Sequence, residues 1–431
     1  MSASKEDLAS EHLAGLHARA AALGVPGYRL LRREQLIEEI IARDGEATVE
    51  PALGQARTEE AAADPPPREA EPVAAEQVPA EQEAAGEPVT GVLDIVPAGH
   101  GFLRLTGLEP DPEDVYISAS QIRRCELRAG DRVEGPARPP RRGERHPALV
   151  RVDSVNGEQP GEERAAGFEE LTPIAPHRRI QLAPDADDVL VRAVDLLAPL
   201  AFGQRVLVIS GPRSGRTTLL RGLVGAIGAA EQAPGVIVLL VDERPEEVTE
   251  WKRQAPGAEI AAAPADLEAE DQVRHAELAL ARAKRRAESG EDVVVVIDSL
   301  TRLGIAYRDP MEVKPFFGAG RELEEEGIGS LTVIATVLRG IEEEGALEAV
   351  ETTESSTVVL DASLAAAGVM PAIDVSRTAA VGEERLREDA ELDAVRRLRE
   401  ELRDLDPRAA TEALAQRIRS SASNAELLSS L

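Results

Sequence analysis

The stretch Ile209–Leu220 reads ISGPRSGRTTLL and comes close to a phosphate-binding loop. Such a loop has the pattern G-x-x-x-x-G-K-[ST] between a strand and a helix, where backbone N–H groups hold phosphate oxygens. The apolar run Val206–Ile209 precedes the loop, and TTLLRGLVGAIGAA follows it, as a strand and a helix would. Ser210 stands at the first glycine position and Arg216 at the lysine position. The segment therefore predicts a nucleotide site with an altered phosphate loop.

Carboxylates follow two other apolar runs. In VVVVIDS the aliphatic run ends at Asp298, in the layout of an aspartate that holds Mg²⁺, and Thr217 in the loop offers a second ligand. LLVDERPEEV brings Asp242 and Glu243 to the end of a strand, where a carboxylate can orient or deprotonate an attacking water. Each feature alone is compatible with a packing turn or a solvated strand end. Together and in this order, they favour a single nucleotide site at one edge of the sheet. They are weaker evidence that the bound nucleotide is hydrolysed.

The strands that must position these groups are near-continuous aliphatic runs, as expected for strands buried on both faces of a parallel sheet. They read RVLVIS, VIVLLVDE, DVVVVIDS, LTVIATVL and TVVLDASL, and they alternate with helical stretches. This pattern predicts an α/β nucleotide-binding core over residues 159–385. A highly charged helical segment, residues 386–431, follows it.

Three further segments are predicted before the core. Residues 1–45 have helical periodicity and indicate a small helical module. Residues 46–88 are rich in Ala, Glu and Pro without aliphatic periodicity, which predicts a disordered acidic linker. Residues 89–158 contain short strand-like runs separated by Gly and Pro, which is typical of a small closed β-barrel.

The overall composition limits the classes of partner. The chain of 431 residues has a formal net charge of −30 and an isoelectric point near 4.7. This acidic balance opposes non-specific attraction to polyphosphate, so any nucleic-acid contact requires a local basic patch. The single cysteine, Cys125, fits a reducing cytosol. We find neither a signal-peptide pattern nor an apolar run long enough for a bilayer, and we expect a cytoplasmic protein without a membrane partner.

The barrel segment carries residues suited to single-stranded nucleic acid. Phe102 and Tyr116 offer ring faces on which bases can stack. Cations along the same segment are supplied by Arg104, Arg123, Arg124, Arg141, Arg142 and Arg145. The alternative is that Phe102 belongs to the barrel core and that the arginines are ordinary solvated charges.

The segments VDERPEEVTEWKRQ and IDSLTRLGIAY resemble the Rho family of bacterial transcription termination factors, and so do FEELTPIAPHRRIQL, FFGAGRELEEEGIGSLTVIATVL and MPAIDVSRT. The barrel segment from GVLDIVPAGHGFLRL onward is similar to the family's cold-shock or OB-type barrel, and residues 5–45 to its helical N-terminal module. The resemblance implies a RecA-like P-loop core and a ring-shaped, RNA-dependent ATPase and helicase. It also implies ATP and Mg²⁺ as cofactors.

The resemblance assigns roles to particular positions. ATP phosphates would lie on the loop of Gly211, Pro212, Arg213, Ser214, Gly215, Arg216, Thr217 and Thr218, with Arg244 near the nucleotide. Glu243 would be the base for water, and Thr217 and Asp298 would hold Mg²⁺. The RNA surface would comprise Gly99, His100, Gly101, Phe102, Leu103, Arg104, Asp114, Val115, Tyr116, Glu144, Arg145 and His146. His100 and His146 stand where the family usually has aromatic residues, so we expect looser RNA binding.

Four departures from the family pattern concern mechanism. Arg216 replaces the loop lysine, and a planar guanidinium cannot place its charge as a slim ammonium does. A glycine-rich pore loop is missing after Tyr307, where AYRDPMEVKPFFGAG passes directly to the next helix. Glu351 stands at the lysine position of the other pore loop. The segment DASLAAAGVMPAID lacks both arginines that precede PAID in the family, one of which acts as an arginine finger.

Two functions therefore remain open from the sequence. The first is a Rho-type termination factor that binds nascent RNA and ATP and works as an RNA-dependent ATPase and helicase (a hydrolase) with the transcription complex. The second is a hydrolysis-impaired paralogue that binds RNA or Rho subunits as a regulator. By resemblance the partners are single-stranded RNA, RNA polymerase, and copies of the chain in a homo-hexamer or a mixed ring with another Rho.

Overall fold

The computed structural model describes residue 37 and residues 86–161, 166–182, 188–340 and 345–431. The chain divides into two units, Met1–Gln77 and Val78–Leu431, and the elements of the fold belong to the second. The predicted helical module of residues 1–45 lies outside the described residues except for Ile37. The predicted linker lies outside them except for Gly86, Glu87 and Pro88.

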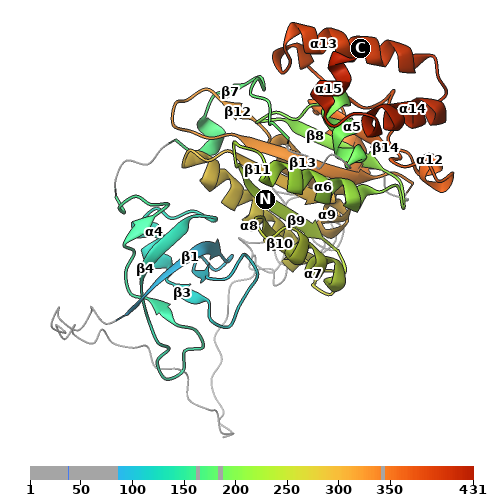
Figure 1. The fold of residues 1–431 in the computed structure, drawn as a ribbon. Coiled ribbons are helices and arrows are strands. Elements are labelled where there is room, and N and C mark those ends of the chain that lie inside the picture. Colours follow the sequence, from blue (N-terminus) through green and yellow to red (C-terminus); the bar gives the residue numbers. More distant parts are fainter. Residues whose placement is uncertain (1–36, 38–85, 162–165, 183–187, 341–344) are drawn as a thin grey trace, which may run out of the picture. The chain divides into compact units, whose positions relative to one another are not determined.

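A small β-barrel occupies the first part of the second unit (Figure 1). Its strands run in the order β1-β2-β3-β5-β4-β6, and an additional pairing of β1 with β4 closes the sheet. Alternate residues point inward, so that Leu93, Leu103 and Val133 form part of a separate apolar core. The elements are β1 (Glu87–Ile95), β2 (Gly101–Arg104), β3 (Val115–Ile117), α4 (Ala119–Arg124), β4 (Arg132–Arg138), β5 (Ala148–Leu149) and β6 (Ser154–Val155).

The core is built on a seven-stranded sheet in the order β10-β9-β11-β13-β8-β14-β15. All neighbouring strands pair in parallel except β15, which runs antiparallel to β14. The strands are β8 (Arg205–Ser210), β9 (Gly235–Val241), β10 (Glu259–Ala263), β11 (Val293–Asp298), β13 (Leu331–Leu338), β14 (Ser356–Leu360) and β15 (Ala379–Ala380). A short antiparallel pair, β7 (Pro173–Ile174) with β12 (Glu322–Leu323), lies outside this sheet.

Helices cover both faces of the core sheet, as its doubly apolar strands require. One buried cluster joins the sheet to α5 (Val189–Leu197), α6 (Arg216–Gly228), α7 (Pro245–Gln254), α13 (Asp389–Arg403), α14 (Pro407–Arg419) and α15 (Asn424–Ser429). The cluster on the other face includes residues of α8 (Ala269–Glu288), α9 (Leu300–Tyr307), η3 (Pro310–Val313), α10 (Lys314–Gly318) and α11 (Gly345–Val350). Three short helices complete the fold, namely η2 (Phe168–Glu170), α12 (Ala362–Ala366) and η4 (Glu383–Arg385).

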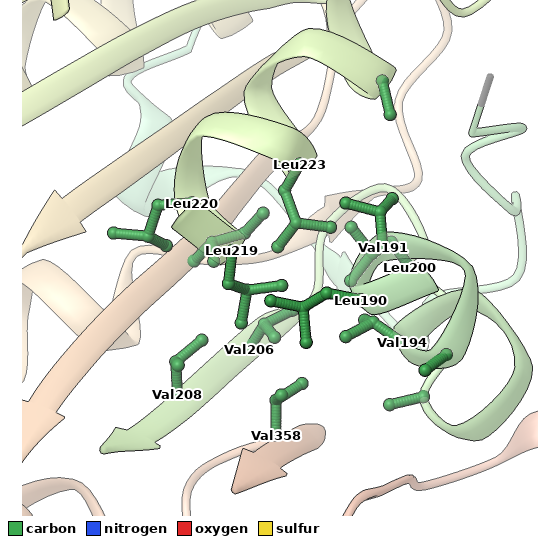
Figure 2. Close-up of a cluster of buried hydrophobic side chains, with 14 of the residues drawn as sticks. Leu190, Val191, Val194, Leu200, Val206, Val208, Leu219, Leu220, Leu223 and Val358 are labelled. Carbon is green, nitrogen blue, oxygen red and sulfur yellow. The ribbon is translucent and has the colours of Figure 1, made fainter. Parts of the chain in front are cut away.

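Helix α6 is fixed to the sheet by apolar side chains close to its first turn. Figure 2 shows Leu219, Leu220 and Leu223 of α6 beside residues of α5 and above Val206 and Val208 of β8. All five side chains are essentially buried. Because the loop between β8 and α6 is anchored at both ends by this packing, its backbone is held in place before any ligand binds.

The C-terminal helices belong to the apolar core rather than to a separate body. Val395, Leu398 and Ile418 are fully buried in the same cluster as the β8 and β14 strands. The guanidinium of Arg192 in α5 donates hydrogen bonds to the carbonyl oxygens of Ile418 and Ser421, each at 2.9 Å. The segment predicted from charge as an appended helical tail therefore contributes apolar side chains to the core.

The predicted α/β core and β-barrel are both confirmed. Each of the five aliphatic runs named above contains a strand of the core sheet. Several short elements were not predicted, among them the alanine-rich strand β10 and the helix α4 within the barrel. None of the described helices has the length and the apolar character that crossing a membrane requires.

Candidate functional site

The predicted phosphate loop joins β8 to α6. β8 ends at Ser210 and α6 begins at Arg216, with Gly215 in the left-handed region (φ = 94°) at the N-cap. A Cβ atom added to Gly211 would lie 2.8 Å from the Cβ of Ala362, so a glycine is needed there as well. The Ser214 hydroxyl donates to the Gly211 carbonyl at 2.8 Å and closes the loop on itself. The N–H groups of the first turn of α6 are thereby presented at the loop.

The strand order brings the predicted carboxylates to the same edge. β13 separates β8 from β11, and β9 lies on the other side of β11. Asp298 is the last residue of β11, and Glu243 follows two residues after the end of β9. Since these strands are parallel, their carboxyl ends meet at the edge where the phosphate loop also lies.

Arg216 contacts both carboxylates at once. Its Nη2 atom donates to Glu243 Oε1 at 3.2 Å, and its Nε atom lies 3.1 Å from Asp298 Oδ1. The Asp298 side chain is only 2% exposed, and it also accepts a hydrogen bond from Thr336 Oγ1 at 3.0 Å. The residue at the lysine position therefore bridges the predicted base and the predicted metal-holding carboxylate.

Burial changes the acidity of both carboxyl groups. Desolvation raises the pKa of Glu243, the charge of Asp298 raises it further, and Arg216 opposes both effects. Desolvation also raises the pKa of Asp298, against the stabilising contacts of Arg216 and Thr336. A carboxylate with a raised pKa is a better proton acceptor, which is the property that a general base needs.

A cavity of about 490 Å³ opens in front of the loop. All eight predicted loop residues line it, and Leu338 and two further arginines, Arg302 and Arg339, complete the lining. No carboxylate is among these lining residues, because Arg216 stands between the cavity and Asp298. Within the described part of the chain, this is a concave surface with a strongly cationic lining, which suits a polyphosphate.

The predicted Mg²⁺ ligands do not form a metal site as they lie. Thr217 lines the cavity, but the carboxylate of Asp298 is held by Arg216 and Thr336. A hard divalent cation needs free oxygen ligands, and a guanidinium in contact with the carboxylate repels it. Over the described residues, no group of three or more His, Cys, Asp and Glu side chains is arranged to hold a metal ion.

Two of the predicted site residues are not among those that line the cavity. Arg244 is exposed at the N-cap of α7 and is absent from the cavity lining. Asp242 forms an ion pair with Arg302, so it holds a lining arginine and does not face the cavity itself. Sequence reasoning missed Arg302 and Arg339. Arg339 was detectable, because it directly follows β13 at the same sheet edge.

The departures from the family pattern map to defined places. Glu351 is exposed in the turn between α11 and β14. Tyr307 ends α9, and η3 and α10 follow within a few residues where the pore loop was expected. In the segment where the family carries an arginine finger, Met370 is 51% exposed, and a Cβ on Gly215 would lie 3.7 Å from its Cε.

The barrel presents a cluster of four rings. Phe102 on β2 and Tyr116 on β3 are paired across the strands, with ring centroids 6.0 Å apart. His100 lies 5.4 Å from the Tyr116 ring, and His146 lies 5.1 Å from the Phe102 ring. All four side chains are partly exposed. The residue types alone indicated Phe102 and Tyr116 as stacking faces, whereas His100 and His146 were predicted only from the family resemblance, and the structure brings all four together.

Other predicted RNA-surface residues are buried. Arg104 is 5% exposed and is held between Asp94 and Asp114, the second contact being 2.5 Å long. Leu103 and Val115 point into the barrel core. These side chains stabilise the barrel, and Arg104 is not available as a cation for RNA. Gly101 is buried on β2, and Gly99 has a positive φ of 84° in the preceding turn.

The other five arginines predicted for the RNA surface are exposed and lie on two separate segments. Arg123 and Arg124 lie in the last turn of α4 rather than on a strand. Arg141, Arg142 and Arg145 are exposed in the loop between β4 and β5. In that loop, a hydrogen bond from Arg138 lowers the pKa of Glu144 to about 2, so Glu144 stays ionised and fixes the loop.

Two family models match separate parts of this chain. Residues 89–161 match the family model described as Rho termination factor, RNA-binding domain. Residues 191–312 match the ATP synthase alpha/beta family, nucleotide-binding domain. A solved ATPase from the type III secretion system of pathogenic bacteria superposes with a TM-score of 0.50 at 20% identity, covering 64% of this chain and 94% of that chain. At this identity the likeness concerns the fold, which is RecA-like.

Three curated relatives share one name. The chain is 38% identical to transcription termination factor Rho of Aquifex aeolicus over 80% of this chain and 84% of that protein. It is 39% identical to Rho of Bacillus subtilis over 73% of this chain and 78% of that protein. It is 40% identical to Rho of Streptomyces lividans over 79% of this chain, although it spans only about half, 51%, of that relative's length. The chain belongs to the Rho family of transcription termination factors.

Proposed function

We propose that this chain acts in transcription termination by binding nascent RNA on its barrel and ATP in its phosphate-loop cavity. The observation that carries the proposal is the cavity of about 490 Å³ lined by the whole predicted loop, with Glu243 and Asp298 directly behind Arg216. The four-ring cluster of the barrel supports the RNA part, because exposed rings bind single strands by stacking.

The complete activity that we propose for the chain is that of an RNA-dependent ATPase and helicase. Glu243 is the group that would accept the proton of the attacking water, and its raised pKa supports that role. For this to happen Arg216 must turn away from Glu243, because a base held in an ion pair is a poor proton acceptor. The proposed ATPase therefore requires a rearrangement of the site when nucleotide and RNA bind.

A second candidate function is a hydrolysis-impaired family member that regulates by binding RNA or other Rho subunits. The observation in its favour is the double contact of Arg216 with Glu243 and Asp298, which opposes proton transfer. The exposed Glu351, at the position of a pore-loop lysine, adds a negative charge where the family has a cation facing RNA.

One experiment separates the two candidates. ATP hydrolysis by the purified chain is measured with and without poly(C), beside the variants Arg216→Lys and Glu243→Gln. Turnover of about 1 s⁻¹ or faster that needs RNA and is lost in Glu243→Gln supports the ATPase. If the wild type turns over ATP at least tenfold more slowly than this rate, and Arg216→Lys is faster than the wild type, the result supports the hydrolysis-impaired member. Equal background rates in all three proteins, together with no RNA binding, would contradict both candidates.

The partners follow from the same proposal. We infer single-stranded RNA and the transcription complex as partners, and a homo-hexamer or a mixed ring with another Rho as the assembly. A cytoplasmic location is proposed as well, supported by the single cysteine of the chain. Sedimentation of the chain alone, and after mixing with a second Rho carrying a loop lysine, tests the two kinds of ring.

A further inference from the structure

We propose that the cavity at the phosphate loop takes a nucleoside triphosphate in its metal-free form, with the guanidinium of Arg216 in the place of the divalent cation. This inference rests on the proposed nucleotide binding and specifies the ionic form of the ligand. Two independent features carry it, namely the contacts of Arg216 behind the cavity and the charges that line the cavity.

The first feature is the occupation of both carboxylates by one cation. The Nη2 and Nε atoms of Arg216 lie 3.2 Å from Glu243 Oε1 and 3.1 Å from Asp298 Oδ1, respectively. The Asp298 side chain is 2% exposed, and its Oδ1 atom also accepts from Thr336, so this oxygen already has two partners within the protein. Mg²⁺ sheds its water reluctantly and needs open oxygen ligands, so it competes poorly with an attached guanidinium for this position.

The second feature is the lining of the cavity. Four arginines, Arg213, Arg216, Arg302 and Arg339, face it, and no acidic residue lines it. Arg216 and Arg302 are ion-paired with carboxylates behind the lining, while no ion pair joins Arg213 or Arg339 to a carboxylate among the described residues. A metal-free triphosphate carries two more negative charges than its Mg²⁺ complex and is therefore the better match for this lining.

A guanidinium is suited to serve both sides of such a site. It has five N–H donors in a planar fork, so it can hold two carboxylates and still donate to a phosphate oxygen. A lysine ammonium at the same position has three donors on one atom and cannot span Glu243 and Asp298 in the same way. The replacement of lysine by Arg216 thus links loss of a metal site to retention of a phosphate site.

The test is an equilibrium titration of the wild-type chain with fluorescent mant-ATP, once in excess MgCl₂ and once in EDTA at matched ionic strength. We expect the dissociation constant in EDTA to equal the value in MgCl₂ or to be up to about tenfold smaller. A dissociation constant at least tenfold larger in EDTA would overturn the proposal while leaving nucleotide binding itself intact. No saturable binding in either buffer would overturn both this proposal and the proposed function.

Variants assign the effect to Arg216. In Arg216→Lys the carboxylates are no longer bridged, and we expect EDTA to weaken binding at least fivefold relative to MgCl₂. Arg339→Ala serves as the matched control, because Arg339 lines the same cavity without touching either carboxylate. It should weaken binding in both buffers without creating a metal requirement. Thr217→Ala should change binding by the same factor in both buffers, and a loss confined to MgCl₂ would contradict the proposal.

Discussion

Arg104 and Arg216 are among the arginines that contact two carboxylates, and their surroundings differ greatly. Arg104 lies inside the barrel between Asp94 and Asp114, with all three side chains nearly fully buried. Arg216 lies at the edge of a cavity and is 19% exposed. The first arrangement is fixed by its burial, whereas the second can exchange a carboxylate for a phosphate oxygen. The same residue type therefore serves a structural role in one place and a ligand-binding role in the other.

Sequence reasoning succeeded for Glu243 and Asp298 because each follows a recognisable apolar strand, and parallel strands bring their ends together. It could not detect the partners of Arg104, since Asp94 and Asp114 lie ten residues away on either side. Nor could it show that Arg216 contacts two carboxylates, because that contact depends on the lateral order of β8, β13, β11 and β9.

The ion pairs of Arg104 lead to a prediction about stability. Arg104→Met leaves the buried carboxylates of Asp94 and Asp114 without their cation, which should lower the free energy of unfolding by about 3–5 kcal/mol. Urea denaturation followed by far-UV circular dichroism measures the change. Arg145 is exposed, so the control Arg145→Ala should have a free energy of unfolding within about 0.5 kcal/mol of the wild-type value. If the free energy of unfolding of Arg104→Met equals that of the control, the ion pairs of Arg104 with Asp94 and Asp114 do not stabilise the barrel.

The four-ring cluster leads to a prediction about RNA binding. Removing one stacking face in Phe102→Ala or Tyr116→Ala should weaken binding of a fluorescein-labelled oligo(C) by about 1–3 kcal/mol, measured by fluorescence anisotropy. Tyr307→Phe, in the core and hydrogen-bonded to Glu277, provides an aromatic control that should bind as the wild type does. Unchanged affinity in both ring variants would show that the rings are not the RNA surface.

At the scale of elements, strand β11 and its neighbours position the site. β11 carries Asp298 at one end, and Asp292 precedes its other end. The Asp292 carboxylate accepts hydrogen bonds from Arg178 at 2.8 and 2.9 Å and from the backbone N and the hydroxyl of Ser330 at 2.9 and 2.7 Å. These bonds fix the start of β11 against the turn that leads into β13.

The acidity of Asp292 gives a prediction for the pH dependence of stability. Burial alone would raise its pKa, but the hydrogen bonds from Arg178 and Ser330 outweigh burial and hold the pKa below the ordinary range. Because the folded-state pKa is lower than the unfolded one, the stabilisation is complete above about pH 4 and is lost as the pH falls further. Asp292→Asn should lower stability at pH 7 and flatten the loss below pH 4.

Urea denaturation at pH values from 7 to 3 measures this dependence. Asp393→Asn is the matched control, because the Asp393 side chain is 68% exposed and should leave the profile unchanged. An Asp292→Asn profile parallel to that of the wild type over the acid range would contradict the assignment.

The elements that were missed have physical reasons. β10 reads EIAAA, and alanine has a low strand propensity, so its place in the sheet comes from pairing with β9. Helix α4 has only six residues and depends on the Ser118 capping box rather than on apolar periodicity. Neither element contains the repeated apolar pattern by which longer strands and helices are predicted from sequence.

At the scale of the whole molecule, the order of barrel, core and C-terminal helices was predicted, whereas the packing of the last segment was not. Its high charge indicated helices but not their packing, because a charge count does not show which face of a helix is apolar. In the structure Leu398 and Leu402 are buried with Trp251, the single tryptophan of the chain. The predicted boundary at residue 386 stays a prediction.

This packing can be tested with a matched pair of leucines. Leu398→Ala should lower the free energy of unfolding by about 2–5 kcal/mol, because it leaves a cavity in the core. Leu405→Ala, at a site 42% exposed, should change it by less than about 0.5 kcal/mol. The intrinsic fluorescence of the buried Trp251 during urea denaturation reports both. An unchanged Trp251 transition in Leu398→Ala would show that the C-terminal helices fold separately from the core.

The claim on which this account depends is that the loop of residues 211–218 binds a triphosphate. Isothermal titration calorimetry of the purified chain with ATP tests it most directly, beside Gly211→Val, whose side chain would collide with Ala362. We expect one saturable site per chain with a dissociation constant of about 100 μM or tighter, and we expect Gly211→Val to lose it. Absence of saturable heat in the wild type, or identical binding by Gly211→Val, would contradict the account.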